Sequence, residues 1–254
     1  LRDIYSVRYF LFECLQAVLF VMRAVCSYIA GGGECAVCGE KCGALPLCRR
    51  CRKKYFAVTP SAGGKRCSVC GKILVSEHGT CMQCRSRKLL LHTDIVFPLY
   101  SYRLWNTVLL FRWKIEGERV LSPFFASKTA EAIALLDPGV TVVPVPPRPG
   151  KIREKGWDQI EELSRFLELR YHFKTARILE RSSRREQKTL DRENRIETIG
   201  LSYSLKKGAV VPAKVCLIDD VMTTGATVES CAAVLKAGGA QKVYAVMLFT
   251  VDSA

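Results

Sequence analysis

From about residue 93 onward, short runs of apolar residues alternate with longer stretches of helical period. The runs show no polar alternation, which is typical of strands in a parallel sheet that is covered on both faces. They predict strands at 95–100, 140–145 and 215–218, and the other stretches predict helices at 105–114, 120–136, 159–170 and 228–237. This alternation predicts an α/β fold, in which a mostly parallel sheet carries flanking helices.

The N-terminal 30 residues have a different pattern. Residues 15–22 are almost wholly apolar, but Arg8, Glu13 and Arg23 interrupt the wider segment. The apolar part is too short for a membrane span and lacks a clear signal-peptide cleavage motif. We therefore expect an amphipathic helix at 1–30 that packs on the rest of a cytoplasmic protein, without a membrane span. Attachment to a membrane surface is the alternative.

The segment between the third predicted strand and the last predicted helix has the residues of a ligand-binding loop. Gly225 permits backbone conformations that other residues avoid, so successive amides can point into one hollow. Thr223, Thr224 and Thr227 add hydroxyl groups, and the N-terminus of the helix adds partial positive charge. These features predict a site for one phosphate group.

Two adjacent acids, Asp219 and Asp220, precede this phosphate site. Carboxylates at this position can accept hydrogen bonds from vicinal hydroxyls, or hold Mg²⁺ through water. A nucleoside triphosphate loop would also contain a lysine, and none lies between Asp219 and Ser230. A phosphate at one end and a diol at the other describe a ribose 5-phosphate. The alternative is an ordinary acidic turn between a strand and a helix.

The same stretch resembles the signature of type I phosphoribosyltransferases, which bind phosphoribosyl pyrophosphate (PRPP). Four apolar residues, two acids, two variable residues and Thr-Thr-Gly-x-Thr occur in that order. The resemblance implies that Asp219 and Asp220 hold the ribose hydroxyls, directly or through Mg²⁺. It also implies a type I phosphoribosyltransferase-like fold. The residues implied for PRPP and phosphate binding are Val221, Met222, Thr223, Thr224, Gly225, Ala226 and Thr227.

A basic turn, PVPPRPGKIREKGWDQ, follows the predicted strand at 140–145. Its prolines end the strand, because proline cannot continue a central ladder of hydrogen bonds. The turn leaves the same edge of the sheet as the phosphate site, so we expect it to bind an anion, namely pyrophosphate. The candidate residues are Val145, Pro146, Arg148, Lys155 and Gln159. A solvated charged turn is the alternative.

Residues 181–195, RSSRREQKTLDRENR, are too polar to pack and too long for an ordinary connection. They predict a mobile loop or lid. The candidate contact residues are Arg181, Arg184, Arg185, Gln187, Lys188 and Arg195. These cations could bind a pyrophosphate when the lid closes, or they could line a path for nucleic acid, since Lys and Arg neutralise phosphates in both cases. The sequence does not separate the two.

Eight cysteines form four CxxC pairs in two blocks. The first block is Cys35, Cys38, Cys48 and Cys51, and the second is Cys67, Cys70, Cys81 and Cys84. Each pair forms a knuckle that directs two thiolates at one ion, and two knuckles complete a tetrahedron. We expect a double zinc ribbon with two structural zinc ions, because neither site leaves a position open for water.

Some alternatives remain open for these cysteines. A redox CxxC is one, although paired cysteines in a cytoplasmic protein generally bind metal rather than form bridges. Cys42 could replace Cys38 or Cys48, and His78 could replace Cys81. Interleaved pairing between the two blocks is also open.

The chain has 254 residues and a formal net charge of +15, which suggests an anionic partner. Two Zn(Cys)₄ units at about −2 each would leave about +11, so the basic excess survives zinc binding. Hydrophobic residues make up 49% of the chain and charged residues 25%, as in soluble globular proteins.

Residues from about 35 to the end resemble the ComF family, in which a cysteine-rich zinc module precedes a phosphoribosyltransferase domain. The resemblance rests on the CxxC knuckles, VVPVP, a Lys-Gly-Trp-Asp-Gln turn, Gln187-x-x-Leu190-x₄-Arg195 and the PRPP loop, in that order. In that turn the family usually has Arg and Asn where this chain has Lys155 and Asp158. Such proteins are linked to DNA uptake in natural transformation, which implies single-stranded DNA and the DNA-uptake machinery as partners.

Three functions are therefore hypotheses. We favour a ComF-like protein that binds PRPP with Mg²⁺, and single-stranded DNA, during DNA uptake. A metabolic phosphoribosyltransferase would transfer ribose 5-phosphate from PRPP to an acceptor and release pyrophosphate, by positioning and charge stabilisation. The third hypothesis is a regulator that senses PRPP without turnover. The candidate catalytic residues are Asp219, Asp220 and Arg195, and the expected domains are 1–30 (helix), 31–92 (double zinc ribbon) and 93–254 (phosphoribosyltransferase-like).

Overall fold

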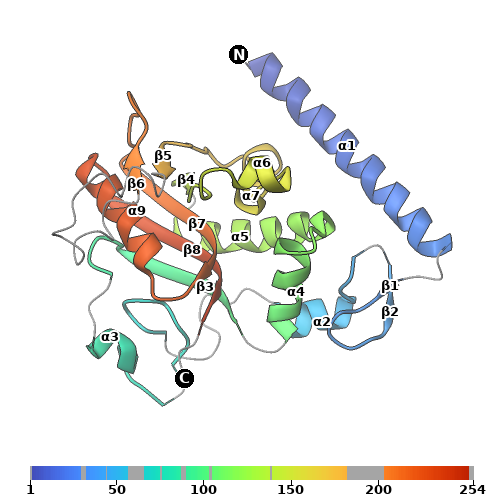
Figure 1. The fold of residues 1–254 in the computed structure, drawn as a ribbon, viewed down its shortest axis with the longest axis horizontal. Coiled ribbons are helices and arrows are strands. Elements are labelled where there is room, and N and C mark those ends of the chain that lie inside the picture. Colours follow the sequence, from blue (N-terminus) through green and yellow to red (C-terminus); the bar gives the residue numbers. More distant parts are fainter. Residues whose placement is uncertain are drawn as a thin grey trace.

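A parallel sheet lies between two layers of helices, and the cysteine-rich segments lie in the lower part of the view (Figure 1). The computed structural model describes residues 2–29, 33–43, 45–56, 66–74, 76–86, 90–102, 105–137, 139–181 and 203–251.

The central sheet has four parallel strands in the order β3, β8, β7, β4. Their bounds are β3 Ile95–Ser101, β4 Thr141–Pro144, β7 Lys214–Met222 and β8 Lys242–Thr250. Val215 pairs with Val243, and Val142 pairs with Cys216, so the apolar runs occupy the middle of the sheet. The predicted α/β fold with a parallel sheet is confirmed.

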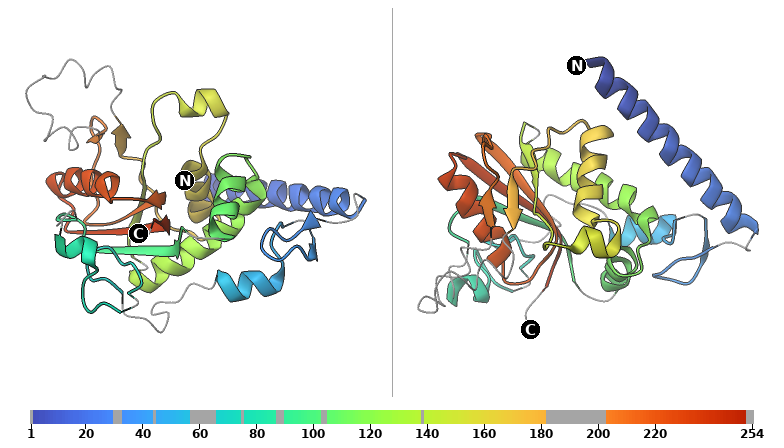
Figure 2. Two further views of the ribbon diagram at one scale, coloured as in Figure 1. Left: turned by 60° about the horizontal axis from the view of Figure 1, so that its bottom comes forward. Right: turned by 45° about the horizontal axis from the view of Figure 1, so that its top comes forward.

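Helices cover both faces of the sheet (Figures 1 and 2). One face carries α4 (Trp105–Lys114), the 3₁₀ turn η1 (Arg119–Leu121), α5 (Ser122–Leu136) and α7 (Gln159–Leu169). The other face carries α9 (Ala226–Ala237). The short helix α6 (Lys151–Lys155) follows β4, and β5 (Leu179–Arg181) pairs with β6 (Tyr203–Leu205) in a small antiparallel sheet.

Each face of the sheet has its own apolar core. On the α5 side, the Trp113 and Phe125 ring centroids are 4.7 Å apart, and Trp113 Nε1 donates to Ser122 Oγ at 2.8 Å. On the α9 side, Leu217 packs with Val228 and Leu235, all fully or almost fully buried. Burial of each such side chain contributes about 1.5–3 kcal/mol. The strands are therefore held in place by an apolar core on each face of the sheet.

The cysteine-rich part consists of two small units with four paired cysteines each. The first four-cysteine unit contains β1 (Gly33–Glu34), β2 (Lys41–Cys42) and α2 (Arg49–Tyr55), and the second contains α3 (Met82–Ser86). The first unit is joined to the α5-side core, because the Phe56 and Tyr100 rings are 5.2 Å apart and Tyr100 Oη donates to Phe56 O at 3.0 Å. The two units are consistent with the expected zinc ribbons.

Helix α1 (Arg2–Ile29) projects from the rest of the molecule (Figure 1; Figure 2, right). Phe12 contacts Phe166 of α7 at 5.0 Å between ring centroids. However, large apolar side chains such as Leu11, Val18 and Ile29 are exposed. Among the described side chains, the expected packing of this helix is therefore limited to part of its surface. Within the described residues, no helix combines the length and apolar character needed to cross a membrane.

Candidate functional site

The loop between β7 and α9 is a tight turn at the amino end of a helix. β7 ends at Met222, and α9 begins at Ala226 after a turn of three residues. Gly225 has φ +86° and ψ −2°, the left-handed conformation that favours glycine. Thr224 Oγ1 accepts a hydrogen bond from Ala226 N at 3.3 Å. We call residues 223–227 the phosphate loop, which places amides and hydroxyls at the positive end of a helix.

Strand β7 runs four residues further than the sequence predicted. Val221 pairs with Phe249 and Met222 pairs with Thr250, so the ladder with β8 carries the strand past both acids. Met222 is buried in the α9-side core. Val221 and Met222 therefore lead into the phosphate loop as strand residues, and the helix begins two residues earlier than predicted.

Because Asp219 and Asp220 are consecutive in a strand, their side chains face opposite sides of the sheet. Asp220 faces the helices α4 and α7, where its Oδ2 contacts Lys114 and Gln159. Asp219 lies toward α9, where burial, and to a smaller extent the charge of Asp219, raises the pKa of Tyr203 and of Cys231. The two acids are therefore not equivalent, although the motif presents them as a pair.

Asp220 is held by two partners in a buried position. Lys114 Nζ lies 2.6 Å from Asp220 Oδ2, and Gln159 Nε2 donates to the same oxygen at 2.5 Å. Asp220 is only 5% exposed. The ammonium group and the amide together supply the charge and the hydrogen bond that a buried carboxylate requires.

A chain of polar contacts extends from Asp220 into the turn that precedes α7. Lys151 Nζ donates to Gln159 Oε1 at 2.5 Å and to Asp158 Oδ2 at 2.6 Å. Asp158 Oδ1 accepts from the backbone amides of Ile160 and Glu161, which caps α7. The carboxylate at 158, where the ComF pattern has Asn, thus caps a helix and pairs with Lys151.

Asp219 has a strongly perturbed titration. Burial, followed by the charge of Asp220, raises the pKa of Asp219 from its usual value near 3.8 to about 7. Asp219 Oδ1 accepts a hydrogen bond from Asp220 N at 2.8 Å, which opposes that rise. Lys114 opposes it as well. A cation at this position would compensate the acid pair and favour ionised Asp219.

The basic turn after β4 brings some candidate residues close to the acids and leaves others in solvent. Val145 is buried, and its amide donates to Ile218 O at 3.1 Å beside β7, with Pro146 next in sequence. Arg148 is exposed and paired with Glu154, so its charge is neutralised locally. Lys155 Nζ donates to Lys114 O at 3.4 Å.

The candidate lid is described only at its first residue. The Arg181 guanidinium lies 5.5 Å from the centroid of the Tyr203 ring, at the end of the small β5–β6 sheet. The other lid candidates lie outside the described residues: Arg184, Arg185, Gln187, Lys188 and Arg195.

The cysteines gather in the two quartets that the spacing predicted. Their Sγ atoms lie within 4.8 Å of one another in each quartet, namely Cys35, Cys38, Cys48 and Cys51, and Cys67, Cys70, Cys81 and Cys84. Neither quartet includes Cys42 or His78, so the block-by-block pairing holds and the interleaved alternative is wrong.

Backbone amides favour the thiolate at one cysteine of each quartet. Burial raises the pKa of the Cys35 thiol, but the amides of Cys48, Cys38 and Val37 lower it more, from about 9 to about 6. The same balance lowers the pKa of Cys67 to about 7, where Cys81 N donates to Cys67 Sγ at 3.3 Å. Four thiol ligands with amide support fit a tetrahedral ion such as zinc.

The sequence indicated Gln159 as a candidate residue and Lys151 as part of a basic turn, but it gave no signal for Lys114. Lys114 is the last residue of α4, and its side chain meets Asp220 of a strand that is distant in the sequence, so no local pattern could identify it. Lys151 lies in the basic turn, where the predicted anion site was a signal, but its carboxylate partner Asp158 was not foreseen.

Comparisons with known proteins point to one family. No protein-family model matches the chain. Competence protein ComFC of Streptococcus pneumoniae (strain ATCC BAA-255 / R6) is 31% identical over 134 residues, which cover 52% of this chain and 57% of that protein. Competence protein ComFC of Bacillus subtilis (strain 168) is 25% identical over 192 residues, 73% of this chain and 76% of that protein. The match thus spans somewhat over half the length of the first relative. These two matches support the assignment of this chain to the ComF family.

Proposed function

We propose that this chain is a ComF-like protein with a competence-related function, which binds PRPP with Mg²⁺ at the carboxyl end of β7 and also binds single-stranded DNA. The observation that carries the proposal is the sequence of features at one sheet edge. An acid pair lies near the carboxyl end of the strand, a left-handed Gly225 forms the turn, and the amino end of α9 follows at once. Ligands of open α/β sheets bind at such edges.

In this proposal the phosphate loop holds the 5-phosphate. Thr223, Thr224 and Thr227 are exposed and can donate hydroxyl hydrogen bonds, and the amides at the start of α9 supply partial positive charge. The loop contains no cation, so the phosphate would be held by neutral donors and by the helix N-terminus.

The acids would serve the ribose and the metal. Asp219 would accept from a ribose hydroxyl or ligate Mg²⁺ together with ligand oxygens, and Asp220 would orient Lys114 beside it. Mg²⁺, when bound, would neutralise pyrophosphate charge. Lys114 and Lys155 would then lie on the side of the departing pyrophosphate, where fixed cations stabilise developing charge.

Single-stranded DNA is the proposed macromolecular partner. The chain carries a net charge of +15, and residues 181–195, which begin at the last residue of β5, contain six arginines and lysines. The names of both relatives refer to competence. Basic segments of this kind bind nucleic acid through the phosphate backbone, with strong salt dependence.

The direct test is calorimetry with PRPP·Mg²⁺, ribose 5-phosphate and inorganic phosphate on the parent and on the pair Asp219→Asn with Asp220→Asn. The pair keeps the shape of the strand and removes charge. We expect PRPP·Mg²⁺ binding to weaken by about 2 kcal/mol or more, since charge-assisted hydrogen bonds are lost. Phosphate binding should persist.

Two outcomes count against the proposal. If the parent protein does not bind PRPP·Mg²⁺, the proposed ligand is wrong. If the Asn pair binds PRPP·Mg²⁺ like the parent, the acids are only residues of the strand and do not contact the ligand. Pyrophosphate release, followed in the same samples with nucleobases added, separates a transferase from a protein that binds PRPP without turnover.

A further inference from the structure

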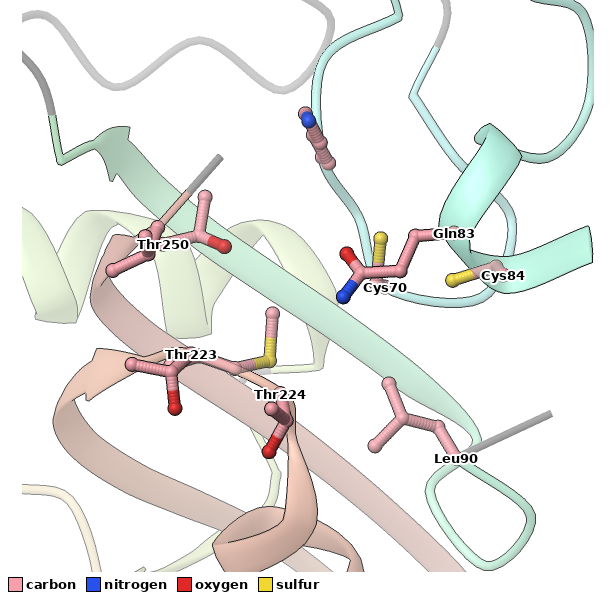
Figure 3. A pocket seen from close by; sticks show the side chains of 10 residues that line it. Cys70, Gln83, Cys84, Leu90, Thr223, Thr224 and Thr250 are labelled. Carbon is pink, nitrogen blue, oxygen red and sulfur yellow. The ribbon is translucent and has the colours of Figure 1, made fainter. Parts of the chain in front are cut away.

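The second four-cysteine unit lies directly against the phosphate loop. A small cavity of about 20 Å³ separates them, with Cys70, Gln83 and Cys84 on one side and Thr223 and Thr224 on the other (Figure 3). A volume of this size holds about one water molecule. The two elements are therefore close neighbours, and Cys70 and Cys84, two of the candidate metal ligands, line the space beside the loop.

Leu90, in the segment that leaves the second four-cysteine unit, covers the glycine of the phosphate loop. A Cβ atom at Gly225 would lie 3.1 Å from Leu90 Cδ2 and 3.5 Å from Leu90 Cγ. The Leu90 side chain thus packs on the backbone at the one position of the loop that has a left-handed conformation. Displacement of Leu90 would free the turn to adopt other conformations.

The next residues are tied to the first turn of α9 through Glu229. The amides of Leu91 and His92 both donate to Glu229 Oε1 at 2.9 Å. His92 Nδ1 lies 2.6 Å from the same oxygen, and Thr93 Oγ1 donates to Glu229 Oε2 at 3.3 Å. The Glu229 carboxylate therefore holds the segment after the second four-cysteine unit against α9, the helix that follows the phosphate loop.

The other side of the unit is anchored to the sheet. A Cβ atom at Gly71 would lie 2.0 Å from Val96 O, so the knuckle touches the β3 backbone. Arg66 donates to Gly71 O at 2.8 Å and to Pro98 O at 3.1 Å, and its guanidinium lies 4.4 Å from the Phe97 ring centroid. The unit thus bridges β3 and the phosphate loop.

The described residues of the first four-cysteine unit lie on the other face of the sheet. Its buried residues Cys35, Cys51 and Phe56 belong to the α5-side core, whereas Cys70 and Leu90 pack on the α9-side core. Among the described cysteines, those that line the cavity beside Thr223 and Thr224 all belong to the second unit. The two metal sites therefore have different neighbours.

We propose that the second four-cysteine unit is a metal-dependent support for the phosphate loop, with Leu90 and Glu229 as the positioning residues. With metal bound at the four cysteines, the unit keeps Leu90 on Gly225 and holds the loop in its anion-binding conformation. Without metal, the knuckles separate, Leu90 moves, and the loop loses affinity for a phosphate ester. The consequence for binding rests on the proposed function, but the support of the loop does not.

Hydrogen exchange on the zinc-loaded protein tests the support. The Cys84→Ser variant removes one ligand of the second unit, and amides in β8 serve as the internal reference for global stability. We expect amides of 223–229 to exchange about tenfold faster or more in the variant, since a local contact is lost while the sheet remains folded. Equal exchange in parent and variant, or an equal increase in β8, would overturn the proposal.

A second pair of variants leaves the cysteines intact. Leu90→Ala removes the side chain that covers Gly225, and Leu91→Ala, at a neighbouring position that is 69% exposed, is the matched control. We expect faster exchange in 223–229, and PRPP·Mg²⁺ binding weakened about fivefold or more, for Leu90→Ala relative to Leu91→Ala. Identical exchange in the two variants contradicts the positioning role.

The two proposals fail in different ways. If the parent binds no PRPP·Mg²⁺ but loop exchange responds to Cys84→Ser and to Leu90→Ala, the proposed ligand is wrong and the metal-dependent support stands. If the parent binds PRPP·Mg²⁺ and neither variant alters loop exchange, the ligand stands and the support is wrong.

Discussion

Lys114 Nζ lies 2.6 Å from Asp220 Oδ2, and this ion pair joins the end of α4 to the end of β7 at the candidate ligand site. Gln159 Nε2 shares the same oxygen. The pair thus connects a helix that the motif does not include with the second acid of the motif.

Lys114→Met should leave the Asp220 carboxylate buried with Gln159 as its remaining described partner. Since hydrogen bonds to charged groups contribute about 1.5–3 kcal/mol and the Lys114 side chain is 34% exposed, we expect a loss near the lower end of that range. Urea denaturation measures it. Lys128→Met, which breaks the surface pair with Glu131, is the control and should cost about 0.5 kcal/mol or less.

A double-mutant cycle separates the pair from its surroundings. Adding Asp220→Asn to Lys114→Met removes the unpaired charge, so the double variant should be more stable than the sum of the two single losses predicts. We expect a coupling energy of about 1 kcal/mol. If the two losses of stability are additive, the contact between Lys114 and Asp220 does not stabilise the fold.

The titration of Asp219 predicts a dependence of stability on pH. Its folded-state pKa of about 7 lies above its usual value near 3.8, so between these values the folded state keeps a proton that the unfolded state has lost. The stability from this group is complete below about pH 4 and is lost as the pH rises through 7.

Asp219→Asn removes this titration. Its free energy of unfolding, relative to that of the parent, should therefore increase as the pH rises from 5 to 8, which urea denaturation at each pH measures. A difference that stays constant over this range would mean that Asp219 titrates normally in the folded protein.

Much of the fold was predictable because its signals are local. The helix predicted at 105–114 is α4 with the same bounds, and the strand predicted at 95–100 is β3 with one further residue. The apolar run before Asp219 marked β7, but its end at Met222 depends on pairing with Thr250 of β8, a contact between distant segments.

The candidate site was predictable in its motif and not in its partners. The PRPP-like stretch located the phosphate loop, and the CxxC spacing gave both cysteine quartets. Lys114, Leu90 and Glu229 could not be identified, because each reaches the site through packing of elements that no sequence period relates. The exposed apolar face of α1 was also not foreseen, since periodicity gives a face but not its partner.

The cysteine quartets predict two zinc ions per chain. Metal analysis of the purified protein should give a ratio near two, and Cys38→Ser and Cys84→Ser should each reduce it to about one, since each removes a ligand from a closed four-thiolate site. One zinc or none in the parent, with reactive thiols at all eight positions, would contradict the assignment of these cysteines.

Single-stranded DNA should bind with an affinity that falls steeply as salt rises. Replacing Arg184, Arg185 and Lys188 by Ala should reduce the slope of log K against log salt by about 2, at about 0.7 per phosphate contact. Fluorescence anisotropy over a series of salt concentrations measures the slope. The matched control replaces Arg49, Arg52 and Lys53, on the exposed face of α2, by Ala, which gives the same change in net charge.

The two triple variants distinguish the paths for DNA. A smaller slope for the first variant alone places the DNA at 184–188. A smaller slope for the α2 variant alone moves the path to the first four-cysteine unit, and absence of binding by the parent at low salt removes DNA as a partner.

The central claim is that residues 223–227 bind the phosphate of PRPP, and a comparison of two glycines tests it most directly. Gly225 and Gly208 both have positive φ, +86° and +74°, but a Cβ atom meets Leu90 at the first and nothing within 4 Å at the second. Gly225→Val and Gly208→Val therefore carry a similar backbone strain, and only the first alters the loop. Calorimetry with PRPP·Mg²⁺ should give binding like that of the parent for folded Gly208→Val, and binding weakened by about 30-fold or more for folded Gly225→Val, because the loop amides no longer converge on one phosphate. Equal affinity of the two variants for PRPP·Mg²⁺ would contradict the account.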